Sequence, residues 1–248
     1  MADTSWIAIG RDAEGFRAFA VEGSEVKTEA RAETEDQAYA RLGFTAQSIR
    51  WIGEGTPDVT PCAVLPPAGR TLPVVTQEQP ADVLGAWPRL WVAGFLAGHE
   101  NWDGVLCIET GDASHWVHVG ANEIISFASF LSLRLATFLG GGYTADPAAM
   151  ADSQSRPERL ASHLRQAEIA GNPAAITGHL IGAELAAARV YWLGQQVGVI
   201  APQGEASIYA RVLAAQGVPV VSATPDDMVQ VGLAAMARAL RLVAVDPD

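Results

Sequence analysis

The chain has 248 residues, 49% of them hydrophobic, so it is long enough to bury one large core or two smaller ones. Its formal net charge of −12 and its single lysine, Lys27, argue against nucleic acid or an anionic membrane as a partner, because both require clustered cations. Two cysteines are too few for a disulfide framework, and no apolar run approaches the roughly 18 to 20 residues of a membrane span. We therefore expect a soluble cytoplasmic protein.

The first hundred residues have the pattern of three strands, a helix and a fourth strand. The helix is expected to begin at Thr34, because Thr34 and Gln37 have the spacing of a capping box. A proline-rich insert, 53–73, follows; its prolines exclude a long helix, and 61–65 is expected to be an edge strand. The four strands are expected at 6–9, 16–21, 25–30 and 48–52.

The remaining residues repeat this order and extend it. Apolar residues with the helical period begin at Phe127, and the glycines 140–142 end that helix. Strands are expected at 105–109, 115–119, 123–127, 196–200 and 218–221, and helices at 127–138, 157–169, 173–193, 205–215 and 225–240. The order strand, strand, strand, helix, strand, helix, strand, helix is typical of a ribonuclease-H-like unit.

Two strand-turn-strand segments, one hundred residues apart, indicate an internal duplication. Asp12 and Asp112 take the same place in the two turns, and the aromatic residues Phe16 and Trp116 follow them at the same offset. We therefore predict an α/β fold with two ribonuclease-H-like lobes, in which helices flank mixed sheets. This is the architecture of actin, hexokinase and Hsp70, whose nucleotide and substrate meet in the cleft between the lobes. The expected lobes are 1–103, which contains the proline-rich insert, and 104–248.

Several residues have both a functional and a structural interpretation. Asp12 and Asp112 are either carboxylates for Mg²⁺ or phosphate, or caps of their hairpin turns. Gly178 and Gly182 lie on one face of the expected helix 173–193 and permit close approach of either a ligand or a second helix. Glu184 on the same apolar helix would be costly to bury alone, so we expect it to face the cleft or to meet an arginine.

Other residues that could carry chemistry do not form a recognisable site. The spacing of His99, Glu100 and Asp103 relative to the histidines at 115 and 118 matches no compact set of metal ligands, so no metal site is predicted from these residues. Cys107 lies between two apolar residues and is expected in the core. The sequence also lacks the common motifs of serine hydrolases, Walker-type nucleotide-binding proteins and zinc proteases.

The segment Gly178-His179-Leu180-Ile181-Gly182-Ala183-Glu184-Leu185, followed by Gly194-Gln195-Gln196, resembles the 2-dehydro-3-deoxygalactonokinase (2-keto-3-deoxy-galactonokinase) family. Residues 6–19, 61–68 and 107–119 resemble other segments of that family in the same order. The resemblance implies phosphorylation of a keto-deoxy sugar acid with ATP and Mg²⁺. It also implies that Gly111, Asp112, Gly178 and Gly182 contact the cofactor and that Arg17 and Glu184 contact the substrate.

The chain departs from the family in both phosphate-binding loops. The first family loop, roughly Asp-x-Gly-Ser-Thr-x-x-Arg, corresponds to residues 10–17, where Arg17 alone is kept and Asp12 could replace the carboxylate by a shift of two residues. The second loop keeps Gly111 and Trp116, but His115 stands in place of a lysine. Phosphoryl transfer depends on positioning and charge stabilisation, so such losses are hard to offset.

Two functions therefore stay open. The first is a sugar-acid kinase with Asp12 and Asp112 as the candidate catalytic residues and with ATP and Mg²⁺ as cofactors. The second is a catalytically inactive family member that needs no cofactor and binds a small ligand or another protein. The expected partner is a small sugar acid or another small ligand, and a homo-oligomer is compatible with either function.

Overall fold

The computed structural model describes residues 5–66, 71–111 and 113–243, and the side chains of 240–243 are not described. The chain forms two compact units. The first unit comprises Met1–Asp103, Val119–Ser126 and Thr224–Asp248, and the second comprises Gly104–His118 and Phe127–Ala223. The sequence-based division placed everything after residue 103 in one lobe, whereas here the last helix belongs to the first unit.

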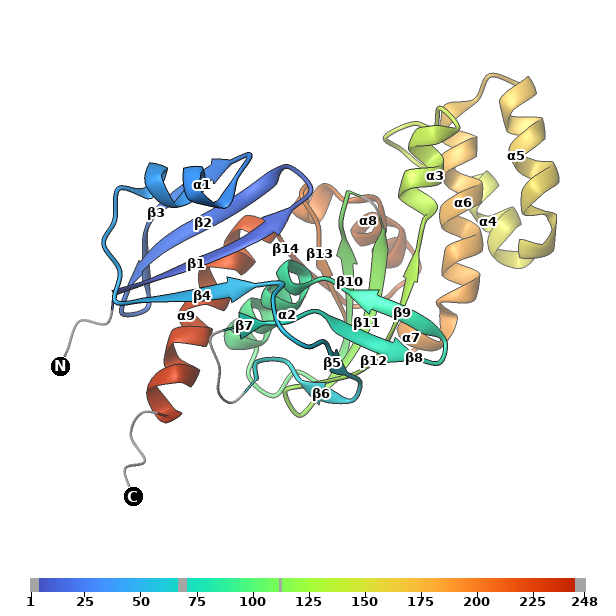
Figure 1. Cartoon of the computed structure of the whole chain (residues 1–248). Coiled ribbons are helices and arrows are strands. Elements are labelled where there is room, and N and C mark those ends of the chain that lie inside the picture. Colours follow the sequence, from blue (N-terminus) through green and yellow to red (C-terminus); the bar gives the residue numbers. More distant parts are fainter. Residues whose placement is uncertain (1–4, 67–70, 112, 244–248) are drawn as a thin grey trace. The chain divides into compact units, whose positions relative to one another are not determined.

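The main sheet of the first unit has the strand order β3-β2-β1-β4-β7 (Figure 1). β2 is antiparallel to both β1 and β3, whereas β4 is parallel to β1 and β7. A second sheet has the order β5-β8-β9. The elements of this unit are β1 (Ser5–Asp12), β2 (Gly15–Glu22), β3 (Glu25–Ala32), α1 (Glu35–Leu42), β4 (Ser48–Ile52), β5 (Asp58–Val59), β6 (Cys62–Ala63), β7 (Thr71–Leu72), β8 (Val75–Glu78), β9 (Ala81–Leu84), α2 (Ala86–Gly98) and α9 (Pro225–Val243).

The central strand β1 is buried on both of its faces, as its continuous apolar sequence requires. Successive side chains of a strand point to opposite faces, and here Ile7 and Ile9 join one hydrophobic cluster while Trp6 and Ala8 join another. Buried residues of α1 complete the first cluster, and buried residues of α2 and α9 complete the second. The first unit is thus a sheet with helices on both faces.

Helices α2 and α9 approach each other closely at two glycines. A Cβ atom on Gly94 would lie 2.1 Å from the carbonyl oxygen of Met228, and one on Gly232 would lie 2.4 Å from that of Leu90. Val229 and Leu233 of α9 are fully buried against this surface. The last helix therefore completes the core of the first unit.

A buried arginine fixes the proline-rich insert to α2. Arg89 is 0% exposed and donates hydrogen bonds to the carbonyl oxygens of Val64 (2.8 Å), Pro73 (2.9 Å) and Ala63 (2.7 Å). The Asp58 carboxylate lies 2.7 Å from the same guanidinium and balances its charge. The expected edge strand within 61–65 is confirmed as β6, which pairs with the first residues of β12.

The sheet of the second unit repeats the strand order of the first. Its strands follow the order β14-β13-β10-β11-β12, and β13 is parallel to both β10 and β14. When the strands of each of these two sheets are counted in chain order, both sheets have the third strand at one edge, then the second, first and fourth, and the fifth at the other edge. This shared order is expected for a duplication. The elements are β10 (Gly104–Glu109), β11 (Ser114–Gly120), β12 (Glu123–Phe130), α3 (Ser132–Phe138), α4 (Pro147–Ser155), the 3-10 turn η1 (Pro157–Arg159), α5 (Leu160–Ile169), α6 (Pro173–Ala187), α7 (Arg189–Trp192), β13 (Val197–Ile200), the 3-10 turn η2 (Gly204–Ala206), α8 (Ile208–Ala215) and β14 (Val220–Ala223).

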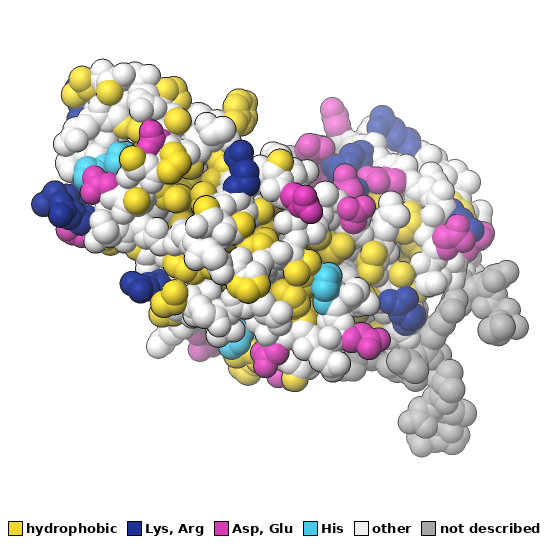
Figure 2. All heavy atoms as spheres, turned by 180° about the vertical axis from the view of Figure 1, so that it is seen from behind, with side chains coloured by type: hydrophobic (Ala, Val, Ile, Leu, Met, Phe, Trp, Pro, Cys, Tyr) yellow, Lys and Arg dark blue, Asp and Glu magenta, His cyan; other side chains and the backbone are white. Residues whose placement is uncertain are grey.

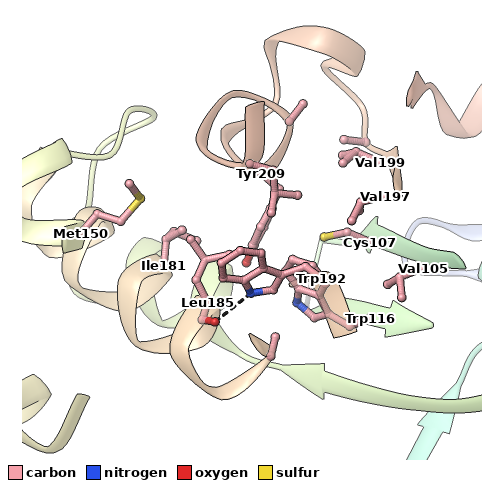
Figure 3. Close-up of a cluster of buried hydrophobic side chains, with 14 residues drawn as sticks. Val105, Cys107, Trp116, Met150, Ile181, Leu185, Trp192, Val197, Val199 and Tyr209 are labelled. Carbon is pink, nitrogen blue, oxygen red and sulfur yellow. Dashed lines mark hydrogen bonds between the residues drawn. The ribbon is translucent and has the colours of Figure 1, made fainter. Parts of the chain in front are cut away.

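Aromatic side chains fill the core between this sheet and helices α6 to α8 (Figure 3). Trp116 and Tyr209 are fully buried and meet edge to face, with ring centroids 6.0 Å apart. The indole of Trp192 donates to the carbonyl oxygen of Leu185 at 2.9 Å, which ties α7 to the end of α6. Cys107 is 0% exposed in this cluster, as predicted.

Some element boundaries differ from those predicted. The helix expected from Phe127 begins at Ser132, because residues up to Phe130 extend β12 and Phe127 is buried in the sheet. The helix expected at 173–193 ends at Ala187 and is followed by the short helix α7. Helix α4, which the sequence analysis missed, begins with Asp146 as its cap and Pro147 in its first turn. No helix in the described part of the chain is long and apolar enough to span a membrane.

Charged side chains of both signs are mixed on the face of the molecule seen in Figure 2. On this face the coloured Lys and Arg side chains stand apart from one another and do not merge into a broad basic surface.

We predict that Gly182→Ala destabilises the second unit. Its Cβ would lie 2.2 Å from the carbonyl oxygen of Met150 in α4, so one helix must move. Overpacking of this kind costs about 1–3 kcal/mol, and it opposes the gain of about 1 kcal/mol that alanine brings to a helix. Urea unfolding measures the change.

Gly98→Ala is the matched control, because no atom lies within 4 Å of the added Cβ. This control should leave the free energy of unfolding unchanged or slightly increased. Equal effects of the two substitutions would contradict the packing role of Gly182.

Candidate functional site

A cavity of about 530 Å³ lies within the second unit. Four segments line it: residues 109–111 at the end of β10, one face of α3, the loop 141–143 together with Thr177 of α6, and residues 202, 203 and 206–208 before and at the start of α8. Its size falls within the range of small-molecule sites in proteins. Side chains such as Leu133, Ala136 and Ile208 give it apolar walls.

The turn after β10 is held by one side chain. The Thr110 hydroxyl donates to the carbonyl oxygen of Ala113 at 2.8 Å and accepts from the amide of Ala113 at 3.1 Å. Gly111 in this turn lines the cavity, so its backbone is close to any bound ligand. Asp112, the other residue expected here, lies outside the described residues.

The loop after α3 is pressed against α6. A Cβ atom on Gly141 would lie 2.6 Å from Oγ1 of Thr177, so this position accepts only glycine without a shift. The Thr177 hydroxyl donates to the carbonyl oxygen of Gly142 at 2.9 Å, and the Gly142 amide donates to that of Pro173 at 2.9 Å. The glycines predicted to end a helix therefore also shape one wall of the cavity.

Glu109 is the one acidic side chain among the described residues that line the cavity. It is only 7% exposed, and its Oε1 atom is buried without a hydrogen-bond partner. Burial raises the pKa of Glu109 above its ordinary value, a hydrogen bond from Ser207 opposes this, and the nearby Glu184 raises it further. Ser207 is also the cap of α8 and accepts from the amide of Ala210 at 3.0 Å.

Glu184 is the second buried carboxylate of this unit, at 2% exposure. Its Oε1 accepts hydrogen bonds from the Ser114 hydroxyl (2.6 Å) and the Trp116 indole (2.8 Å), and its Oε2 accepts from the Tyr209 hydroxyl (2.7 Å). Burial raises the pKa of Glu184, while these hydrogen bonds and one from Ser132 lower it. Neutral donors, and not the expected arginine, therefore surround this carboxylate.

Two residues predicted for the first loop already have partners in the first unit. Oδ1 of Asp12 accepts from the amide of Glu14 at 2.8 Å, and Oδ2 lies 2.8 Å from the Arg31 guanidinium. This geometry supports the turn-cap interpretation of Asp12. Arg17 is 7% exposed and binds the carboxylates of Glu29 (2.6 Å) and Asp226 (3.0 Å), so it is not free to meet an acidic substrate in this arrangement.

The two glycines predicted to contact the cofactor instead pack against a helix. A Cβ atom on Gly178 would lie 2.5 Å from the carbonyl oxygen of Asp146, and that on Gly182 would meet Met150. Both contacts are with the start of α4 or the residue before it. These contacts support the helix-packing interpretation of Gly178 and Gly182, and their contact with a cofactor stays a prediction.

The histidines and carboxylates of the described residues do not gather into a metal site with three or more ligands. His163 and His179 both lie next to the buried Ser153 hydroxyl, at 3.0 and 2.9 Å, within the packed helices α4 to α6. A depression of about 670 Å³ in the first unit has an apolar floor, and its charged residues Glu100, Glu123 and Arg238 are exposed. The cavity with Glu109 is thus the better candidate for specific recognition.

Glu109 was missed in the sequence analysis. The available signal was an acidic residue at the end of an otherwise apolar strand, 105–108, directly before the turn. The surroundings of its carboxylate depend on the fold, because its hydrogen-bond donor Ser207 is nearly a hundred residues away in the sequence.

The duplicated sheet order and the flanking helices define the actin-like class of folds, and solved structures of this class match the chain. A candidate 2-dehydro-3-deoxygalactonokinase from Sinorhizobium meliloti is 20% identical, with a TM-score of 0.78 over 94% of this chain and 98% of that chain. The activator of 2-hydroxyisocaproyl-CoA dehydratase from Clostridium difficile, solved with bound ADPNP, is 9% identical, with a TM-score of 0.50 over 98% of this chain and 99% of that chain.

Within this class, residues 136–236 match the model of the DGOK family, 2-keto-3-deoxy-galactonokinase. The resemblance to this family that the sequence predicted is thereby confirmed for the segment from α3 to α9. No curated protein sequence matches the chain.

Glu184 should make the stability of the second unit depend on pH. The pKa of Glu184 is raised in the folded state. Its contribution to the free energy of unfolding is therefore fully present below the unfolded-chain pKa of about 4.3 and is lost as the pH rises through the folded-state pKa. Glu184→Gln lacks this titration. The free energy of unfolding of the wild type relative to Glu184→Gln should therefore fall as the pH rises from 4, which urea unfolding at a series of pH values would detect. A difference that is constant with pH would contradict the assignment.

Proposed function

We propose that the chain is an ATP-dependent kinase for a keto-deoxy sugar acid and that the nucleotide binds in the cavity of the second unit. The observation that carries this proposal is the cavity itself, formed by the turn after β10, the glycine loop 141–143 and the residues before α8. Gly111, one of the residues that the family resemblance implies for the cofactor, lines it.

The comparisons support this assignment in two ways. The family model that matches residues 136–236 covers most of the segments around the cavity and describes a sugar-acid kinase. The Clostridium difficile activator, which has a similar fold, was solved with an ATP analogue. A cavity of about 530 Å³ with apolar walls is large enough to hold a nucleoside.

The second candidate is an inactive relative that binds a small ligand. The engagement of Asp12 with Arg31 and of Arg17 with Glu29 and Asp226 favours it, because these side chains are then unavailable for a metal or a sugar acid. No lysine, arginine or histidine is among the described residues that line the cavity. A kinase of this kind must stabilise the transferred phosphoryl group by other means.

We predict that ATP with Mg²⁺ raises the melting temperature of the protein and that ADP is released in the presence of 2-dehydro-3-deoxy-galactonate. A coupled ADP-release assay with a panel of keto-deoxy sugar acids measures the second effect. ATP-dependent stabilisation without turnover on any of these acids would favour the inactive relative. The absence of both stabilisation and turnover would rule out the kinase.

Ala206→Trp tests the place of the nucleotide. Ala206 is exposed and lines the cavity, so the indole should fill part of it without disturbing the core, and we expect the KM for ATP to rise at least about tenfold. Ala214→Trp is the control, because Ala214 is exposed on α8 outside the cavity lining. An equal KM for ATP in both variants would place the nucleotide elsewhere.

A further inference from the structure

Among the described polar side chains that line the cavity, three threonines offer a ligand only acceptor oxygens, while Gln203 and Tyr143 also carry donor groups. The hydroxyl protons of Thr110, Thr137 and Thr177 are all donated to backbone carbonyl oxygens. Their oxygen lone pairs remain, together with the carboxylate of Glu109, so the available ligand atoms are oxygens. Oxygen-only donor sets suit hard cations such as Mg²⁺ and Mn²⁺.

Glu109 has a buried charge that no described side chain neutralises. Its Oε1 has no hydrogen-bond partner, its side-chain donor is the neutral Ser207, and it interacts unfavourably with the like-charged Glu184. Leaving a buried carboxylate oxygen unpaired costs stability. A cation bound at this oxygen would remove that cost and offset the repulsion between the two carboxylates.

The same carboxylate would repel a nucleotide's phosphates unless a cation lay between them. Mg²⁺ in nucleotide sites is commonly held by one or two carboxylates, several waters and the phosphates themselves, so a single protein carboxylate suffices. This fits a cavity in which no described group of three or more metal-binding side chains exists.

We propose that Glu109 binds a divalent cation that joins the phosphates of a nucleotide to the cavity of the second unit. The inference rests on the proposed function, because the nucleotide supplies the remaining ligands. It moves the metal role away from Asp12, whose carboxylate is occupied by Arg31 and by the amide of Glu14. The cation, when bound, would neutralise phosphate charge, and Glu109 would hold it.

The test is binding of Mn²⁺ to the full chain in the presence of ADP, followed by electron paramagnetic resonance of the free ion. The variant is Glu109→Gln, which keeps the shape and an oxygen acceptor for Ser207 but removes the charge. The matched control is Glu205→Gln, which removes an exposed carboxylate from the same loop region that does not line the cavity. We expect Glu109→Gln to weaken Mn²⁺ binding at least about tenfold and Glu205→Gln to leave it within about twofold of wild type.

Equal Mn²⁺ affinity of Glu109→Gln and wild type, or no Mn²⁺ binding to the wild type with ADP, would overturn the proposal. A melting temperature of Glu109→Gln at or above that of the wild type without metal would show that the fold is intact, because an unpaired buried charge has been removed. If this variant unfolds, Glu109→Asp, which keeps the charge but shortens its reach, is measured in the same way and should also weaken binding.

The assay of turnover separates this inference from the proposed function. Mn²⁺ binding that depends on Glu109, without ADP release on any sugar acid, would support the metal site and reject the kinase. Turnover on a sugar acid with unchanged Mn²⁺ affinity in Glu109→Gln would support the kinase and reject the role of Glu109.

Discussion

The buried carboxylate of Glu184 connects four of the elements that build the second unit. Located on α6, it accepts hydrogen bonds from Ser114 and Trp116 of β11 and from Tyr209 of α8, and it is also bonded to Ser132 at the start of α3. A carboxylate at this depth is tolerated only when its lone pairs are satisfied, so each of these donors must keep its place. Because α3, α6 and α8 also supply walls of the cavity, this interaction fixes the shape of the candidate site.

The first unit contains a buried charge of the opposite sign with a comparable role. Arg89 on α2 donates hydrogen bonds to three backbone carbonyl oxygens of the proline-rich insert, and Asp58 balances its charge. Prolines leave such segments without a regular ladder of amide donors, so their carbonyls need partners from elsewhere. In both units, then, an ionised side chain on a helix organises structure that local sequence preferences alone do not specify.

The sequence was sufficient to predict the fold class because the relevant signals are local. The apolar run of β1, the Thr34 cap and the repeated strand-turn-strand pattern each depend on neighbouring residues, and the structure confirms them. The site was harder to predict because its properties depend on distant partners. The ion pair of Asp12 with Arg31 joins residues that are distant in the sequence. The packing of Gly178 and Gly182 against α4 is likewise a tertiary contact. The unpaired oxygen of Glu109 also follows from its three-dimensional surroundings.

The discontinuous composition of the first unit has a consequence for how the chain is made. Its main sheet comes from residues before 73, but Val229 and Leu233 of α9, which complete one of its two hydrophobic clusters, follow the whole second unit in the sequence. During synthesis, the second unit can be complete while α2 alone covers this face of β1 and the part that α9 buries is still open. An exposed apolar sheet face invites association with other chains, so the nascent protein depends on prompt docking of its last helix.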